Sequence, residues 1–233
     1  MSRTARVVIP DVSLHIVHRG HDRADCFFDE ADYLAYLDAL RGYAPRFACS
    51  VHAYCLMTNH VHLLVTPHAP DACAQLMKHL AQRHSHRINA KRERTGTLWE
   101  GRFYSALVPT ETYALNCYRY IEGNPVKPAM VAHPAQYRWS SYHANIGAAR
   151  DDSLTPHPAY LALGSDAAHQ ANAYAELCNT PLDPKAVAEI RKATRNGYAI
   201  GTKRPPRGRP KVLAPENGDC HQFDFDQFDF EKW

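Results

Sequence analysis

Two segments of the 233-residue chain carry side chains whose types and spacing suit chemistry. The first contains His60 and His62, which one residue separates in a β-branched, apolar stretch. Because alternate side chains of a strand share a face, the two imidazoles would project together, while Val61, Leu63 and Val65 face the core. Two neutral imidazoles on one face form half of a metal site. With 15 histidines in the chain, an exposed or hydrogen-bonded pair is the alternative.

The second segment places Tyr120 and Asn124 four residues apart at the end of a predicted helix, hence on one helical face. The phenol could act as a nucleophile and the amide oxygen as a metal ligand. A phenol ionises only near pH ~10, so it needs a metal ion that polarises the substrate phosphate. On spacing alone, Tyr120 as a packing residue and Asn124 as a helix cap remain open.

The hydrophobic period predicts the elements that must position these groups. We expect strands at residues 13–19, 48–56, 60–66 and 102–108, and helices at residues 29–40, 71–92 and 110–122. This order predicts an α+β fold, with a ferredoxin-like split β-α-β antiparallel sheet that carries helices on one face. We expect a first domain over residues 1–150, a small helical extension over 151–200, and a disordered basic linker and acidic tail over 201–233.

Charge is distributed unevenly along the chain. The last 18 residues carry six acids and one lysine, a net −5, so the rest of this +3 chain carries +8 and suits a polyanionic partner. Seven singly spaced cysteines indicate reduced, mostly buried thiols rather than disulfides or a zinc ribbon. No apolar run approaches the roughly 20 residues of a membrane span, and no secretory segment follows the basic start. We therefore expect a cytoplasmic, nucleoid-associated protein.

Three separated motifs resemble the REP-associated tyrosine transposases, relatives of the insertion-sequence-200-like transposases. The motifs are Asn59-His60-Val61-His62, Gly96-Thr97-Leu98-Trp99-Glu100-Gly101-Arg102-Phe103, and Cys117-Tyr118-Arg119-Tyr120-Ile121-Glu122-x-Asn124-Pro125-Val126. The resemblance extends in consistent order over roughly residues 5–200. It implies an HUH nuclease fold, and an enzyme that cuts and rejoins DNA.

By position, the resemblance implies that His60 and His62 bind Mg²⁺ or Mn²⁺, with Asn124 as a third, amide-type ligand. It assigns the nucleophile to Tyr120, with Tyr113 and Tyr118 as rivals. The implied substrate is single-stranded DNA beside a hairpin, cut to leave a 5′-phosphotyrosine and a free 3′-hydroxyl. Glu122, two residues along the helix from Tyr120, is interpreted as a surface acid.

A basic stripe on the 71–92 helix and the turn after it could track phosphates. The candidate DNA-binding residues there are Lys78, Arg83, Arg87, Lys91, Arg92 and Arg94, with a solvated helix face as the alternative. Arg102 and Phe103 combine a cation with an aromatic ring that could stack on a base, although Phe103 and Trp99 could equally be core residues. Arg207-Gly208-Arg209-Pro210 resembles an AT-hook core, but a disordered linker is the preferred interpretation.

Two other functions fit parts of the pattern. The first is a module of the same fold that binds hairpin DNA or RNA without cutting it. The second is a zinc hydrolase, which would lack a third clustered ligand and would give Tyr120 no role. A monomer is favoured over a homodimer, because both halves of the site fall in one domain.

Overall fold

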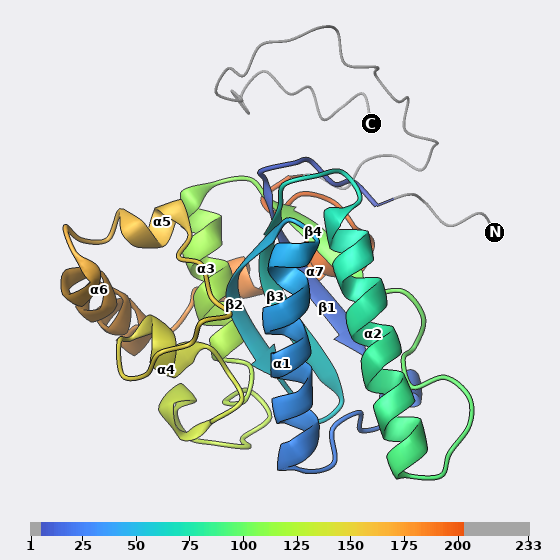
Figure 1. Ribbon diagram of the computed structural model, residues 1–233. Helices are drawn as coiled ribbons and strands as arrows, with labels where there is room; N and C mark the ends of the chain where they lie inside the picture. Colours follow the sequence, from blue (N-terminus) through green and yellow to red (C-terminus); the bar gives the residue numbers. More distant parts are fainter. Residues whose placement is uncertain (1–5, 203–233) are drawn as a thin grey trace, which may run out of the picture.

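The computed structural model describes residues 6–202, and a four-stranded antiparallel sheet lies at its centre (Figure 1). The strands are β1 (Ser13–Arg19), β2 (Cys49–Leu56), β3 (His60–Pro67) and β4 (Tyr104–Val108). Their order across the sheet is β2-β3-β1-β4, so β1 and β3 are the two central strands. This is the order of a ferredoxin-like fold, and it confirms the predicted fold class.

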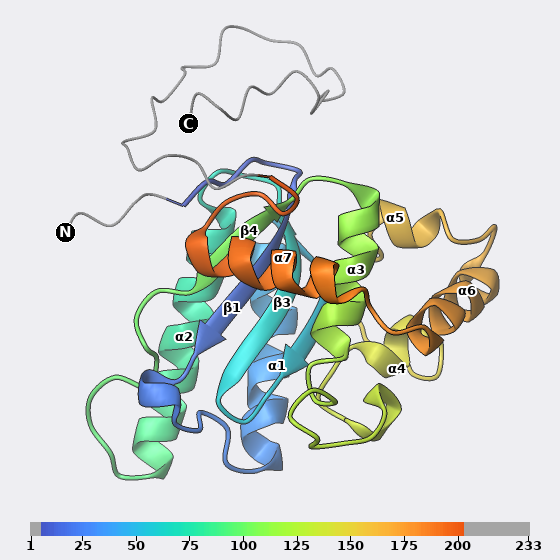
Figure 2. The same cartoon turned by 180° about the vertical axis from the view of Figure 1, so that it is seen from behind.

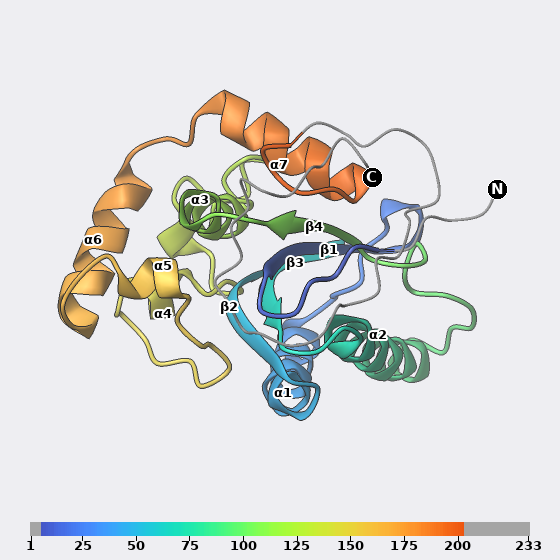
Figure 3. The same cartoon turned by 90° about the horizontal axis from the view of Figure 1, so that it is seen from above.

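Helices cover both faces of the sheet (Figure 3). On one face lie α1 (Glu30–Arg46) and α2 (Ala72–Lys91), the two helices that connect strands. On the opposite face lie α3 (Glu111–Glu122), which packs on β2 and β3, and α7 (Pro184–Asn196), which packs on β4 and β1 (Figure 2). The short η1 (His21–Arg23), η2 (Pro134–Gln136), α4 (Tyr142–Asn145), α5 (Pro158–Leu161) and the longer α6 (Ala167–Asn179) complete the described chain.

The sequence predicts helices on one face of the sheet, and α1 and α2 lie there. The structure has a second helical layer, α3 and α7, on the opposite face. The reason lies in the strands, whose side chains are apolar or buried on both faces. Leu14, Ile16 and Leu63 pack toward α1 and α2, whereas Leu64 and Ala106 pack toward α3 and α7. A sheet with two buried faces needs a helical layer on each.

Local signals set the helix ends close to where the sequence predicts them. Asp29 caps α1 by accepting a hydrogen bond from the backbone N–H of Asp32, and Thr110 caps α3 in the same way through Tyr113. The helix predicted at 29–40 continues to Arg46, and the strand predicted at 102–108 begins at Tyr104.

Several other expectations bear on the described residues. Six cysteines are free, five of them buried, as the scattered spacing predicted; Cys220 lies outside the described residues. None of the described helices is long and apolar enough to cross a membrane. The acidic tail and the Arg207-Gly208-Arg209-Pro210 element also lie outside the described residues.

A buried carboxylate joins α3 to the helices that follow it. Glu122 is 1% exposed, so its interpretation as a surface acid is wrong. Its carboxylate accepts hydrogen bonds from Ser141 at 2.5 Å, Asn145 at 2.7 Å and Tyr174 at 2.5 Å, on and beside α4 and on α6. These donors could not be assigned from sequence, because they follow 19 to 52 residues later. They hold the end of α3 that carries Tyr120.

Burial raises the pKa of Glu122 from 4.5 to about 7, although its three hydrogen bonds oppose the rise. Between about pH 4.5 and about pH 7, Glu122 thus keeps its proton in the folded protein but has lost it in the unfolded chain. We therefore predict that this group lowers the free energy of unfolding as the pH rises from about 4.5 to about 7, by on the order of 3 kcal/mol.

Urea unfolding of wild type and Glu122→Gln across this range measures the effect. The difference between their unfolding free energies should change with pH, because glutamine does not titrate. Glu100→Gln, at an exposed position, is the matched control and should run parallel to wild type. A constant difference between wild type and Glu122→Gln would contradict the prediction.

Candidate active site

The central strand β3 presents His60 and His62 on the face covered by α3. Val61, Leu63 and Val65 are fully buried on the other face, toward α1 and α2. The rings of His60 and His62 lie 4.8 Å apart between centroids, nearly perpendicular to each other. His62 is 4% exposed and His60 is partly buried. Strand alternation thus places both imidazoles together, as their spacing predicts.

Tyr120 lies against this pair. Its ring centroid is 5.8 Å from that of His62, and the planes meet at 75°. It is also 5.5 Å from the ring of His15, a residue of β1 on the same sheet face. Tyr120 is 5% exposed, because α3 packs over β2 and β3. The structure therefore brings together two histidines and a phenol that are about 60 residues apart in the sequence.

The two rival tyrosines have other surroundings. Tyr118 is fully buried, its ring packs on Tyr160 and Tyr174, and its hydroxyl accepts a hydrogen bond from the backbone of His157. The hydroxyl of Tyr113 donates to Glu189 of α7. Neither ring contacts the histidine pair, whereas Tyr120 does.

Asn124 lies one helical turn beyond Tyr120 and is 7% exposed. Its amide nitrogen donates to the backbone oxygens of Tyr120 at 2.9 Å and Ile121 at 3.3 Å. The amide oxygen accepts a hydrogen bond from the Nζ of Lys127 at 3.5 Å. The oxygen is the atom that a hard cation would bind.

Three cations surround the pair and the phenol, and sequence reasoning missed all three in this role. The Nζ of Lys127 lies 3.4 Å from the centroid of the Tyr120 ring, although the residue as a whole is exposed. Arg191 of α7 lies beside the Tyr120 phenol, and Arg19 pairs with His60 across β1 and β3. No sequence pattern indicated them, because their proximity arises from the packing of β1, α7 and the segment after α3.

These surroundings determine the charge of the site. Burial first, and then Arg19 and Lys127, lower the pKa of His60 to about 4, and that of His62 falls well below its usual 6.5. Burial raises the pKa of Tyr120, while Arg191 lowers it. Burial and Arg191 lower the pKa of Lys127 to about 7. Both imidazoles are therefore neutral at pH 7, as metal ligation requires.

Two imidazole nitrogens are suited to bind a divalent ion, and a third protein ligand would have to be of another type. The Nδ1 of His60 is hydrogen-bonded to Asn59 at 2.6 Å, and the Nδ1 of His62 to His15 at 3.0 Å, which leaves Nε2 on each ring for a ligand. Such bonds from the far nitrogen are typical of metal-binding histidines. Among residues 6–202, no cluster of three or more His, Cys, Asp or Glu could hold a metal ion. A third protein ligand would thus be an amide oxygen such as that of Asn124.

The basic stripe on α2 lies on the other side of the sheet. Three of its members face the acids of α1: Arg83 lies 3.4 Å from Asp38, and Arg87 and Lys91 lie 3.5 and 2.9 Å from the buried Asp32. Part of the stripe therefore forms ion pairs with acidic side chains of α1. Of the remaining members, Arg92 lies over the ring of Phe28, Arg94 donates to the backbone oxygen of Thr97, and Lys78 is exposed. DNA contact by these residues stays a prediction.

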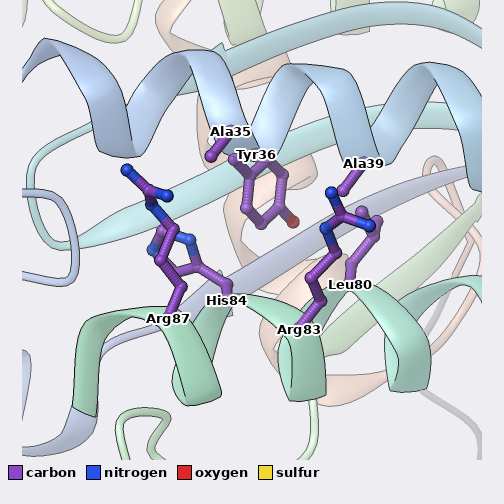
Figure 4. Close-up of a pocket in the computed structure, with 7 residues that line it drawn as sticks. All are labelled: Ala35, Tyr36, Ala39, Leu80, Arg83, His84 and Arg87. Atoms are coloured by element: carbon purple, nitrogen blue, oxygen red, sulfur yellow. The ribbon is translucent and has the colours of Figure 1, made fainter. Parts of the chain in front are cut away.

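Between α1 and α2 lies a cavity of about 130 Å³ (Figure 4). The hydroxyl of Tyr36 is buried there without a hydrogen-bond partner among the described residues. The lining residues are Ala35, Tyr36, Ala39, Leu80, Arg83, His84 and Arg87. The sheet separates this cavity from Tyr120 and the histidine pair, so it is not part of the candidate active site.

The aromatic residues of the second motif belong mainly to the core. Trp99 is 5% exposed, stacks on His18 and donates to the backbone of Ala81. Phe103 is 9% exposed, and the guanidinium of Arg6 lies 3.7 Å from its ring centroid. Arg102 is exposed. Base stacking on Phe103 would require Arg6 to move first.

The sequence pattern of the family described as IS200-like transposases matches residues 8–124, which include both histidines, Tyr120 and Asn124. The chain belongs to the IS200-like transposase family. Transposases of this family process DNA and generally depend on a divalent metal ion. No curated protein matches the sequence.

Two solved structures resemble this transposase. One is a REP-associated tyrosine transposase bound to a REP hairpin, with 17% identity and a TM-score of 0.55, over 68% of this chain and 96% of the other. At that identity the likeness shows the shared fold. The other, a putative transposase from Deinococcus radiodurans, is 26% identical over 52% of this chain and 97% of its own, with a TM-score of 0.36.

Proposed function

We propose that this transposase cuts single-stranded DNA beside hairpins, with Tyr120 as the nucleophile and His60, His62 and Asn124 as ligands of Mg²⁺ or Mn²⁺. The observation that carries the proposal is the packing of the Tyr120 ring against His62, with 5.8 Å between centroids. Family membership supports DNA processing, and the hairpin complex of the structurally similar transposase supports the substrate class.

The cations of the site suit a phosphodiester. Among residues 6–202, the charged groups that act on His60, His62 and Tyr120 are Arg19, Lys127 and Arg191, and none of these is a carboxylate. A phosphate bound beside these groups would therefore meet the positive charges of Arg19 and Arg191, and that of Lys127 in its protonated form. Such charges favour its binding and stabilise the extra negative charge of the transition state. A bound divalent ion would polarise the non-bridging oxygens of that phosphate as a Lewis acid.

The chemical step is a transesterification. The Tyr120 phenol oxygen forms a bond to phosphorus, the bond from phosphorus to the 3′-oxygen breaks, the phenol loses its proton, and the departing 3′-oxygen gains one. Burial opposes ionisation of the phenol, and Arg191 favours it by stabilising the phenolate. The phosphotyrosine retains the energy of the phosphodiester, so a 3′-hydroxyl can reverse the step and join strands.

The alternatives differ in what they require. A module that binds hairpins without cutting them would use the same cations and leave Tyr120 unreacted. A zinc hydrolase would require a third clustered His, Cys, Asp or Glu ligand, which the described residues do not supply. A monomer stays a prediction, as do the division into three segments and the cytoplasmic, nucleoid-associated location.

We predict a covalent adduct between wild-type protein and a labelled single-stranded oligonucleotide that carries a hairpin, provided that Mn²⁺ or Mg²⁺ is present. A denaturing gel detects it. Tyr120→Phe should abolish the adduct, because the attacking oxygen is gone. Tyr113→Phe, which removes a hydroxyl that contacts Glu189, is the matched control and should keep it. Binding without an adduct across several palindromes from the source genome and both metals would favour the binding module.

The stripe on α2 generates a separate prediction. Lys78 is exposed and forms no ion pair with the described residues, so Lys78→Ala should weaken binding of any single strand. It should also reduce the slope of log affinity against log salt by about 0.7 for one lost phosphate contact. Fluorescence anisotropy at several salt concentrations measures both.

Arg150→Ala is the control, because it removes a charge of the same sign from the exposed segment between α4 and α5, where the guanidinium pairs with Asp152. Equal salt slopes for wild type and both variants would show that this part of α2 does not contact DNA. In that case the cations around Tyr120 would be the next candidates for the DNA path.

A further inference from the structure

A chain of three side chains runs from α7 to the candidate metal site. The Oγ1 of Thr194 lies 2.8 Å from the Nδ1 of His15, and the Nε2 of His15 lies 3.0 Å from the Nδ1 of His62. All three are buried, with exposed fractions of 3%, 1% and 4%. Water therefore has little access to these bonds, and the protein itself must satisfy each donor and acceptor.

The direction of each bond follows from the outermost hydroxyl. Thr194 has a single hydroxyl proton, which it donates to the backbone oxygen of Ile190 at 2.8 Å. The same oxygen must then accept a proton from the Nδ1 of His15. A neutral His15 has no proton left for Nε2, so this nitrogen accepts from the Nδ1–H of His62. The Nε2 of His62 is thereby left with its lone pair free.

The packing of the two rings holds these nitrogens within hydrogen-bonding distance. The His15 and His62 planes lie within 7° of parallel, with centroids 5.3 Å apart. His15 lies opposite Leu64 on β3, and His62 lies opposite Val17 on β1, so the two histidines are diagonal neighbours on one face. The sheet register fixes both backbones, and with the rings stacked in this way the two possible arrangements of the pair differ in which nitrogens carry the protons.

We propose that Thr194 and His15 are positioning residues that hold His62 in the tautomer whose Nε2 can bind a divalent metal ion. The metal ion in this proposal rests on the proposed function, whereas the tautomer of His62 follows from the hydrogen bonds alone. Thr194 lies outside residues 8–124, the segment that matches the transposase family. The helix α7 would thus complete, from outside that segment, a site whose ligands lie within it.

Loss of the Thr194 hydroxyl should reverse the order of protons. In Thr194→Val, which keeps the shape of the side chain, the Nδ1–H of His15 would be buried without an acceptor. His15 would then favour a proton on Nε2, donated to the Nδ1 of His62, and His62 would carry its own proton on Nε2. That proton would occupy the nitrogen that the metal needs.

The experiment is ¹⁵N NMR of the imidazoles in the full-length, metal-free protein at neutral pH, with Mn²⁺ titrated into the same samples. Wild type should show His15 and His62 protonated on Nδ1. Thr194→Val should shift both rings toward the Nε2-protonated form and weaken Mn²⁺ binding by roughly 10- to 100-fold. Thr194→Ser should restore both properties. Asn196→Ala, which removes a different side-chain bond on α7, should leave both unchanged.

A wild-type His62 protonated on Nε2, or a Thr194→Val protein with unaltered tautomers, would overturn the proposed positioning role. His62→Ala separates the two proposals. Mn²⁺ binding that survives His62→Ala would overturn the metal role of His62 and with it the proposed metal site. The tautomers measured in wild type and Thr194→Val would still test the positioning role of Thr194 and His15. Thermal unfolding of each variant verifies that the comparison is made on folded protein.

Discussion

The alternation of β3 is the constraint on which the rest of this structure depends. The strand lies inside the sheet, and both of its faces are covered. Its odd-numbered residues fill the core beneath α1 and α2, while His60 and His62 face α3. A slip of one residue would exchange these faces and bury two imidazoles in an apolar core. The same hydrophobic register that stabilises the sheet therefore fixes the position of the candidate ligands.

Burial of a polar face imposes a second requirement, which is that its hydrogen-bonding groups find partners. On this face the protein supplies them without introducing a carboxylate beside the histidines: His15 partners His62, and Thr194 partners His15. The nearby charged groups are the cations Arg19, Lys127 and Arg191. Desolvation acts on the two imidazoles in the same direction as Arg19 and Lys127, since all three disfavour the imidazolium. The result is a neutral ligand pair in a positively charged site, an arrangement suited to an anionic substrate.

The sequence was sufficient for those features that depend on local pattern. The strand period places His60 and His62 on one face, and the helix period puts Asn124 one turn after Tyr120. It was insufficient wherever a partner comes from a distant element. The interpretation of Glu122 as a surface acid fails because its donors lie on and beside α4 and on α6, and its neighbours in sequence do not indicate them. His15 and Arg191 reach the site only after β1 has paired with β3 and α7 has packed across β1 and β4.

The α2 stripe illustrates the same limit from the opposite direction. A run of basic residues indicates a polyanion only if the charges are free, and Arg83, Arg87 and Lys91 recur every four residues opposite acids of α1. Two of them, Arg87 and Lys91, lie against the fully buried carboxyl group of Asp32, so part of the positive charge contributes to folding. Within the described part of the chain, no ion pair joins Arg19, Lys127 or Arg191 to an acid. If this transposase handles DNA as proposed, the reacting phosphate is therefore held mainly from the α3 and α7 side, and α2 contributes at longer range.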